Sequence, residues 1–217
     1  MKLIDFAIQT AKKAGELILE QSSRPLTVTE KTNNNDLVTN VDKASEELII
    51  SEINKEYKDH AIFAEESSAL ASPESLAKAK YIWIIDPIDG TTNFAHGLPL
   101  YAVSIGIFKT EKIESSKNFS YLAGELIAGV VHAPKLGETY HAEKGKGAFL
   151  NGQSIQVSPT ETIRDSLTVT GFPTKDRERN LPYFQAMLSS CQAIRRLGSA
   201  SLDLCFIASG RFDAYWE

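Results

Sequence analysis

Cysteine is scarce in this chain of 217 residues, which contains only Cys191 and Cys205. Two cysteines cannot form the multi-bridge framework that stabilises small secreted domains, so we expect a reducing, cytoplasmic location. Long apolar runs are also missing, because no uninterrupted stretch approaches the ~18 residues that a membrane span requires. Asp5 falls where a signal peptide would have its apolar run. We therefore expect no membrane partner.

Basic residues are fewer than acidic residues. The chain has 23 lysines and arginines against 28 aspartates and glutamates, a formal net charge of −5. A nucleic-acid backbone is therefore an unfavourable partner for the surface as a whole. Hydrophobic residues make up 42% and charged residues 24% of the chain, as in ordinary folded domains. At about 150 residues per domain, this length allows one domain or two small ones.

The hydrophobic pattern predicts helices at both ends of an extended β region. Apolar residues recur at helical spacing from Ile4 to Ile18, and again from Val41 to Tyr57. Two further helices are expected over residues 177–191 and 199–209. Short apolar or alternating runs predict strands at 26–29, 61–64, 81–85, 101–108, 124–132, 137–142, 153–157, 168–171 and 212–216. This order favours an α+β fold of layered helices and sheets over a regular doubly wound fold.

The most informative segment is residues 83–94, WIIDPIDGTTNF. An apolar strand delivers Asp86 at its end, Asp89 follows three residues later, and Gly90 permits an unusual backbone angle. Thr91 can then begin a helix. Two carboxylates beside a helix N-terminus can hold divalent cations next to a bound phosphate. A lone pair of acids at this spacing would more often only cap a turn, but the whole motif favours a metal site.

Two other acidic segments allow either a functional or an ordinary interpretation. Glu65 and Glu66 directly follow an apolar strand, where open α/β sheets place ligands, although such a pair is often a solvated loop. Asp36 and Asp42 lead into the second predicted helix, where either acid could simply be a helix-start residue.

Taken together, these segments resemble the inositol monophosphatase family of magnesium-dependent, lithium-sensitive phosphatases. The resemblance covers essentially the whole chain in family order. It implies a single domain over residues 1–217, a layered α-β-α-β-α sandwich of the sugar-phosphatase type, and a homodimer. It rests on residues 36–39 with Asp42, 65–67, 83–94, 102–106, 144–149, 151–152 and 198–200.

The resemblance also implies a role for individual residues. Glu65 and Thr91 would position and activate the attacking water, and Asp42 would orient Thr91. The backbone N–H groups of Gly90 and Thr91 would hold the phosphate. The ligands of Mg²⁺, or of Mn²⁺ or Ca²⁺ in the same sites, would be Glu65, Asp86, Asp89 and the carbonyl of Ile88. The residues facing the substrate hydroxyls would be Asp89, Gly198, Ala200 and Glu217.

The sequence departs from the family at its end. The family has a Trp-Asp pair shortly after the position of Glu217; its Asp is a further metal ligand, and a strand-helix segment closes the sheet behind it. That pair is absent from this sequence. We therefore expect a fold that lacks its C-terminal strand-helix segment, in a domain cut short. We also expect these 217 residues to hydrolyse inositol phosphate poorly unless the chain is extended through that segment.

The resemblance predicts Mg²⁺-dependent hydrolysis of a sugar or polyol phosphate monoester, with myo-inositol 1-phosphate as the first choice. Fructose-1,6-bisphosphatase and nucleotide 3′-phosphatase activities are alternatives within the family. Thr92 and Asn93 favour the inositol branch, since the nucleotidase branch usually has a Lys-Glu pair there. A different alternative is a non-catalytic accessory factor in RNA transcription.

Overall fold

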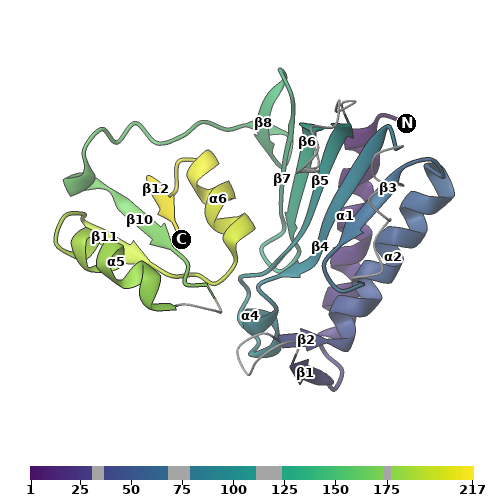
Figure 1. Cartoon of the computed structure of the whole chain (residues 1–217), viewed down its shortest axis with the longest axis horizontal. Coiled ribbons are helices and arrows are strands. Elements are labelled where there is room, and N and C mark those ends of the chain that lie inside the picture. Colours follow the sequence, from purple (N-terminus) through teal and green to yellow (C-terminus); the bar gives the residue numbers. More distant parts are fainter. Residues whose placement is uncertain (31–36, 68–78, 111–123, 174–176) are drawn as a thin grey trace, which may run out of the picture.

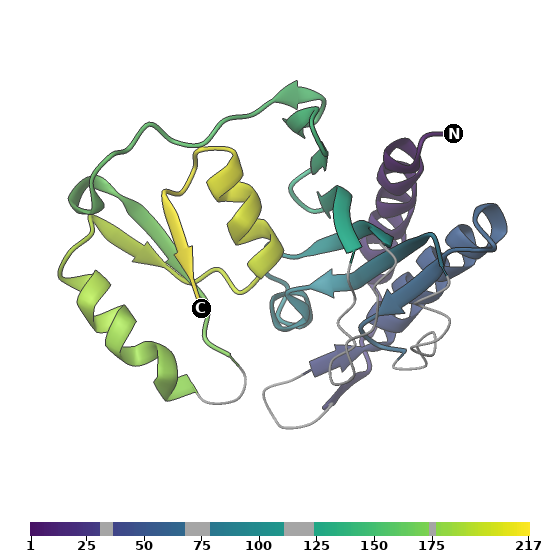
Figure 2. The same ribbon diagram turned by 45° about the horizontal axis from the view of Figure 1, so that its top comes forward.

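Helices and sheets alternate in five layers (Figures 1 and 2). The computed structural model describes residues 1–30, 37–67, 79–110, 124–173 and 177–217. Helices α1 (Leu3–Gln21) and α2 (Asn40–Glu56) cover one face of a large sheet. Helix α6 (Ala200–Ala208) lies between that sheet and a smaller one, and α5 (Leu181–Leu188) lies on the far side of the smaller sheet. The predicted layered α-β-α-β-α architecture is confirmed.

The large sheet has seven strands in the order β3-β4-β5-β6-β7-β8-β9. Strands β3 and β4 pair in parallel, and every other neighbouring pair is antiparallel. The parallel pair places the ends of β3 and β4 at the same edge of the sheet. The strands are β3 (Ala61–Ala64), β4 (Tyr81–Asp89), β5 (Ala102–Thr110), β6 (Gly124–Ala133), β7 (Glu138–Glu143), β8 (Gly147–Leu150) and β9 (Gln153–Ser154).

The smaller sheet has three parallel strands in the order β11-β10-β12. A separate antiparallel hairpin, β1-β2, precedes α2. The remaining elements are β1 (Val28–Glu30), β2 (Leu37–Thr39), the short helix α4 (Thr91–Ala95), β10 (Leu167–Thr170), β11 (Ala193–Arg195), β12 (Ala214–Trp216) and 3₁₀ turns at Ile163–Asp165 and Arg177–Asn180. Within the described ranges, no helix is both long and apolar enough to cross a membrane.

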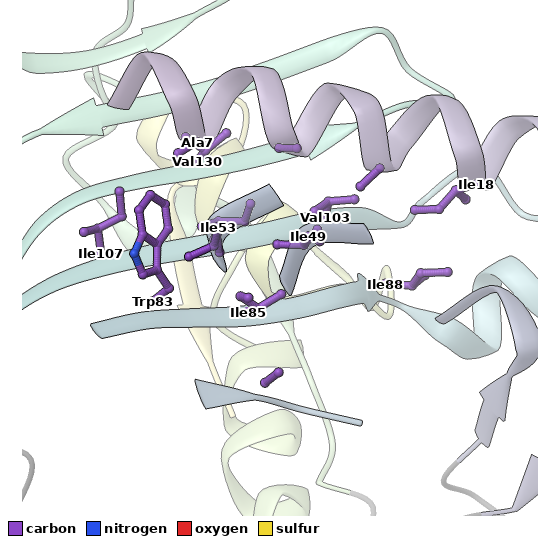
Figure 3. Packing of buried hydrophobic residues seen from close by; sticks show 14 of the residues in the cluster. Ala7, Ile18, Ile49, Ile53, Trp83, Ile85, Ile88, Val103, Ile107 and Val130 are labelled. Carbon is purple, nitrogen blue, oxygen red and sulfur yellow. The ribbon is translucent and has the colours of Figure 1, made fainter. Parts of the chain in front are cut away.

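The main core lies between α1, α2 and the large sheet (Figure 3). Trp83 and Ile85 of β4 pack there with Ile107 of β5, and Ile53 of α2 meets them from the helix layer. Ile82, on the other face of β4, is also buried. Because both faces of β4 are covered, most of its residues are apolar. A second core, containing Leu202 and Phe206 of α6, joins the two sheets.

Most predicted elements are confirmed within a few residues, and the differences have local causes. The region 177–191 was predicted as one helix, but it forms a 3₁₀ turn followed by α5. Pro182 in the first turn of α5 explains this, because proline lacks an N–H and suits a helix start rather than an interior. Strands β2, β8 and β11, of three or four residues each, were not predicted.

The core makes a direct prediction about stability. Ile53→Ala should lower the free energy of unfolding by about 2–5 kcal/mol, because Ile53 is fully buried and its truncation leaves a cavity. The same change at Ile163, which is 57% exposed, should cost no more than about 0.5 kcal/mol. Urea unfolding of both variants measures the difference. Equal losses would show that the α2 layer does not pack as described.

Candidate active site

Strand β4 ends in a distorted turn that carries both acids of the central motif. Its pairing with β5 shifts register between Asp86 and Asp89, so the two carboxylates do not simply alternate across the sheet. Gly90 then adopts a left-handed φ of 94°. A Cβ at Gly90 would lie 2.9 Å from the carbonyl oxygen of Leu100, so both the angle and the space require glycine. Helix α4 starts at Thr91, directly after this turn.

Three acidic side chains crowd together at this edge of the sheet. Burial raises the pKa of Asp86 well above its usual range, and the charges of Glu65 and Asp89 raise it further. The carboxyl group of Glu65 also lies close enough to that of Asp86 to interact with it directly, and this contact contributes to the rise in the pKa of Asp86. Such crowding disfavours the fully ionised cluster unless positive charge is supplied.

The donor set fits a hard divalent cation. Carboxylate and carbonyl oxygens suit Mg²⁺, Mn²⁺ or Ca²⁺ better than zinc. In the described part of the chain, no three His, Cys, Asp or Glu side chains are already arranged around one point as ligands. The Ile88 carbonyl accepts a hydrogen bond from Thr91, and one oxygen of Asp89 is bonded to α6.

Thr91 is held from behind by Asp42. Its hydroxyl lies 2.8 Å from Oδ1 of Asp42 and 2.9 Å from the carbonyl oxygen of Ile88. A hydroxyl has one proton and two lone pairs, so a proton directed at these acceptors leaves Thr91 able to accept from a molecule in front of it. Burial raises the pKa of Asp42, and hydrogen bonds from Thr39 and Thr91 oppose that rise.

A polar face of α2 supports the site, and sequence reasoning missed most of it. Asp42, Ser45 and Glu46 are all buried, although they lie on the same helix as the apolar core residues. The Ser45 hydroxyl donates to the carbonyl of Pro87 at 3.2 Å. The two oxygens of Glu46 accept from the backbone N–H groups of Glu66 and Ser67, each at 2.7 Å. The i, i+3, i+4 spacing of these polar residues was the available signal.

The start of α6 is tied to the same turn by Asp89. Oδ2 of Asp89 accepts from the Ser199 hydroxyl and from the backbone N–H of Ser201, both at 2.7 Å. Asn93 adds a second link, since its side-chain amide donates to the carbonyls of Leu100 and Leu197, both at 2.7 Å. Ser199, Ser201 and Asn93 were not predicted as site residues, because these contacts join segments about 100 residues apart in the chain.

These elements enclose a cleft of about 480 Å³ between the two sheets. Asp42, Asp86 and Ile88 are not among the residues that line it, and Asp36 lies outside the described residues. His96, Arg196 and Asp203 line the cleft in addition. The predicted site residues that line it are Glu65, Asp89, Gly90, Thr91, Gly198, Ala200 and Glu217.

Glu217 is placed in the cleft by its neighbours. The Tyr215 hydroxyl donates to Oε2 of Glu217. The carboxylate also lies against Gly171, where an added Cβ would approach its oxygens to 2.6 Å. Glycine at position 171 therefore leaves the space that the Glu217 carboxylate occupies.

A larger groove, of about 820 Å³, runs between β12 and α5. It shares Tyr215 and Glu217 with the cleft, but neither Glu65 nor Asp89 lines it. Size alone would select this groove as the functional site. The acids and the Thr91 hydroxyl select the smaller cleft, because hydrolytic chemistry needs those groups near the reacting atoms.

Comparison with known proteins shows which family has a similar sequence and fold. The chain matches the model of the inositol monophosphatase family over residues 1–217. It is 41% identical over 221 residues to the Nus factor SuhB of Pasteurella multocida, covering 99% of this chain and 76% of that protein. It is 39% identical over 222 residues to human inositol monophosphatase 1, covering 99% of this chain and 74% of the human one.

Solved structures agree with the sequence matches. The extragenic suppressor protein suhB from Bartonella henselae superposes with a TM-score of 0.86 at 32% identity, covering 99% of this chain and 78% of that one. An IMPase from Thermotoga maritima superposes with a TM-score of 0.82 at 36% identity, covering 99% and 76%. On its motifs, its fold and these matches, the chain belongs to the inositol monophosphatase family.

Proposed function

We propose that this chain is a metal-dependent phosphatase that hydrolyses phosphate monoesters of polyols or sugars, with myo-inositol 1-phosphate as the first substrate. The observation that carries the proposal is the contact of Glu65 with Asp86 next to a Thr91 hydroxyl fixed by Asp42. A crowded acid cluster that favours a bound cation, beside a hydroxyl oriented to accept a hydrogen bond from water, is the arrangement that direct hydrolysis by water requires. Membership of the family supports a phosphatase.

Different residues along the cleft would have different roles in the hydrolysis. Thr91 accepts a hydrogen bond from the attacking water, because its own proton is directed to Asp42 and the Ile88 carbonyl. Glu65 is exposed to the cleft and can take the proton from that water. The backbone N–H groups of Gly90 and Thr91 precede the first α4 hydrogen bond, from Phe94 to Gly90, and are free of helical partners. They would hold phosphate oxygens.

Glu65, Asp86, Asp89 and the Ile88 carbonyl would hold the cation, expected to be Mg²⁺. When bound, Mg²⁺ would supply positive charge that offsets the negative charge developing on the ester oxygen and lowers the pKa of water. Asp89, Gly198, Ala200 and Glu217 would face the substrate hydroxyls. Inhibition by lithium, a homodimer and a cytoplasmic location belong to the same proposal; the first two rest on the family resemblance, the third on low cysteine content.

A second candidate function is a non-catalytic role in transcription. Its support is the similarity to proteins named Nus factor SuhB, one of them 41% identical. Phosphate release from myo-inositol 1-phosphate, fructose 1,6-bisphosphate and a nucleoside 3′-phosphate, with and without Mg²⁺, separates the candidates. Mg²⁺-dependent release from the inositol ester supports the phosphatase. No release from any ester, either by these 217 residues or by a well-folded chain extended through the Trp-Asp segment, favours the accessory role.

The metal site is tested by Asp86→Asn. Even supporting groups around a metal typically contribute 10–100-fold to affinity, so loss of a direct ligand should weaken Mg²⁺ or Mn²⁺ binding at least about tenfold. Calorimetric titration measures this without relying on activity. The control is Asp59→Asn, which removes the same charge from an exposed position outside the cleft. Equal affinity in wild type and Asp86→Asn would refute the site.

Thr91 is tested by the division between kcat and KM. Thr91→Ala should lower kcat roughly 10²-fold with little change in KM, because the lost hydroxyl acts mainly in the transition state. Thr91→Ser keeps the hydroxyl and should recover much of the rate. The neighbouring Thr92→Ala should stay near wild type. A fall of less than about threefold for Thr91→Ala would mean that Thr91 only starts the helix.

A further inference from the structure

Asp203 is a buried carboxyl group that neither the fold nor the proposed chemistry explains. It lies in the first turn of α6 and is 1% exposed. Its Oδ1 atom is buried without a hydrogen-bond partner among the described residues. Leaving a polar atom in this state typically costs about 1–3 kcal/mol, so it calls for an explanation.

The surroundings of Asp203 make this cost larger. Burial raises the pKa of Asp203 to about 7, and the charges of Asp89 and Glu217 contribute to the rise. An uncharged side chain of similar size would fit the same space without this repulsion. An acid in the first turn of a helix interacts favourably with the helix dipole, but this effect, typically about 0.3–1 kcal/mol, is smaller than the cost of the unpaired buried oxygen. A hydrogen-bond donor that enters the cleft would offset the remaining cost.

Asp203 lines the same cleft as Thr91, but its hydrogen-bonding character is different. At the Thr91 end, backbone N–H groups are offered to an anion. Near Asp203, the Ser199 and Ser201 hydroxyls are directed to Asp89, and Glu217 supplies another acceptor. A ligand that satisfies this region must therefore bring hydrogen-bond donors, and a phosphate group, which offers acceptors and negative charge, would be repelled.

We propose that Asp203 is a specificity-determining residue that accepts a hydrogen bond from a hydroxyl group on the alcohol portion of the substrate. Of the two carboxyl oxygens, Oδ1 is the one buried without a partner, so Oδ2 is the oxygen that a hydroxyl in the cleft would reach, and a donor bound there would stabilise the charge that both oxygens share. The proposal rests on the proposed phosphatase function and extends it, because it identifies the substrate alcohol as one that carries a further free hydroxyl. Asp203 then discriminates polyol phosphates from esters of simple alcohols or phenols.

The test compares two esters in wild type and Asp203→Asn. Myo-inositol 1-phosphate carries free hydroxyls, whereas phenyl phosphate has the same phosphate and none. Asp203→Asn keeps an acceptor oxygen but removes the negative charge, so it should raise KM for the inositol ester about fivefold, the difference between a hydrogen bond to a charged group and one to a neutral group, and leave KM for phenyl phosphate unchanged. Its melting temperature should equal or exceed that of wild type, since the substitution removes a buried repulsion.

Asp59→Asn is again the control and should match wild type with both esters. Calorimetric binding of myo-inositol 1-phosphate with Ca²⁺ in place of Mg²⁺ gives a second readout that does not require turnover. If wild type binds and hydrolyses both esters and Asp203→Asn does so equally, the assignment of Asp203 is wrong while the phosphatase stands. If wild type neither binds nor hydrolyses either ester, the proposed function fails and the assignment fails with it.

Discussion

The contact between Glu65 and Asp86 is the constraint around which the site is built. Two carboxyl groups brought together at the ends of parallel strands repel each other when ionised, and partial burial makes that repulsion stronger. The fold must therefore hold both segments by other means. Glu46 holds the loop after Glu65 through two backbone N–H groups, and Ser45 holds the Pro87 carbonyl of β4. Helix α2 thus stabilises an arrangement that the acids alone would oppose.

Asp89 extends the same arrangement to the second sheet. Through Ser199 and Ser201 it fixes the start of α6, and Asn93 fixes the segment just before that helix. Because α6 lies between the two sheets, these bonds set the width of the cleft between Thr91 and Glu217. Farther from the cleft, Arg211 and Glu138 join the end of α6 to β7 through a paired contact at 2.7 and 2.9 Å.

Helix α2 shows how one element serves packing and chemistry together. Ile49 and Ile53 anchor its C-terminal half in the core, whereas Asp42 and Glu46 use the same face of its first turns for polar contacts. Buried polar groups are tolerated when each has partners, and the capping box between Thr39 and Asp42 supplies them at the helix start. The packed half fixes the helix, and the polar half can then position Thr91 within hydrogen-bond distance.

The sequence by itself determined the helices α1 and α2, most of the strands and the acidic turn 83–94, because periodicity and turn residues act over short distances. Family resemblance added the expected roles of Glu65, Asp42 and Glu217. Only the tertiary structure decided that Glu65 contacts Asp86, that Ser199 and Ser201 bond Asp89, and that Asp203 is buried beside them. The first contact depends on the parallel pairing of β3 with β4, and the other two facts depend on how the segment carrying α6 folds back onto the turn after β4. The local sequence pattern does not indicate which segments that are distant in the chain come into contact.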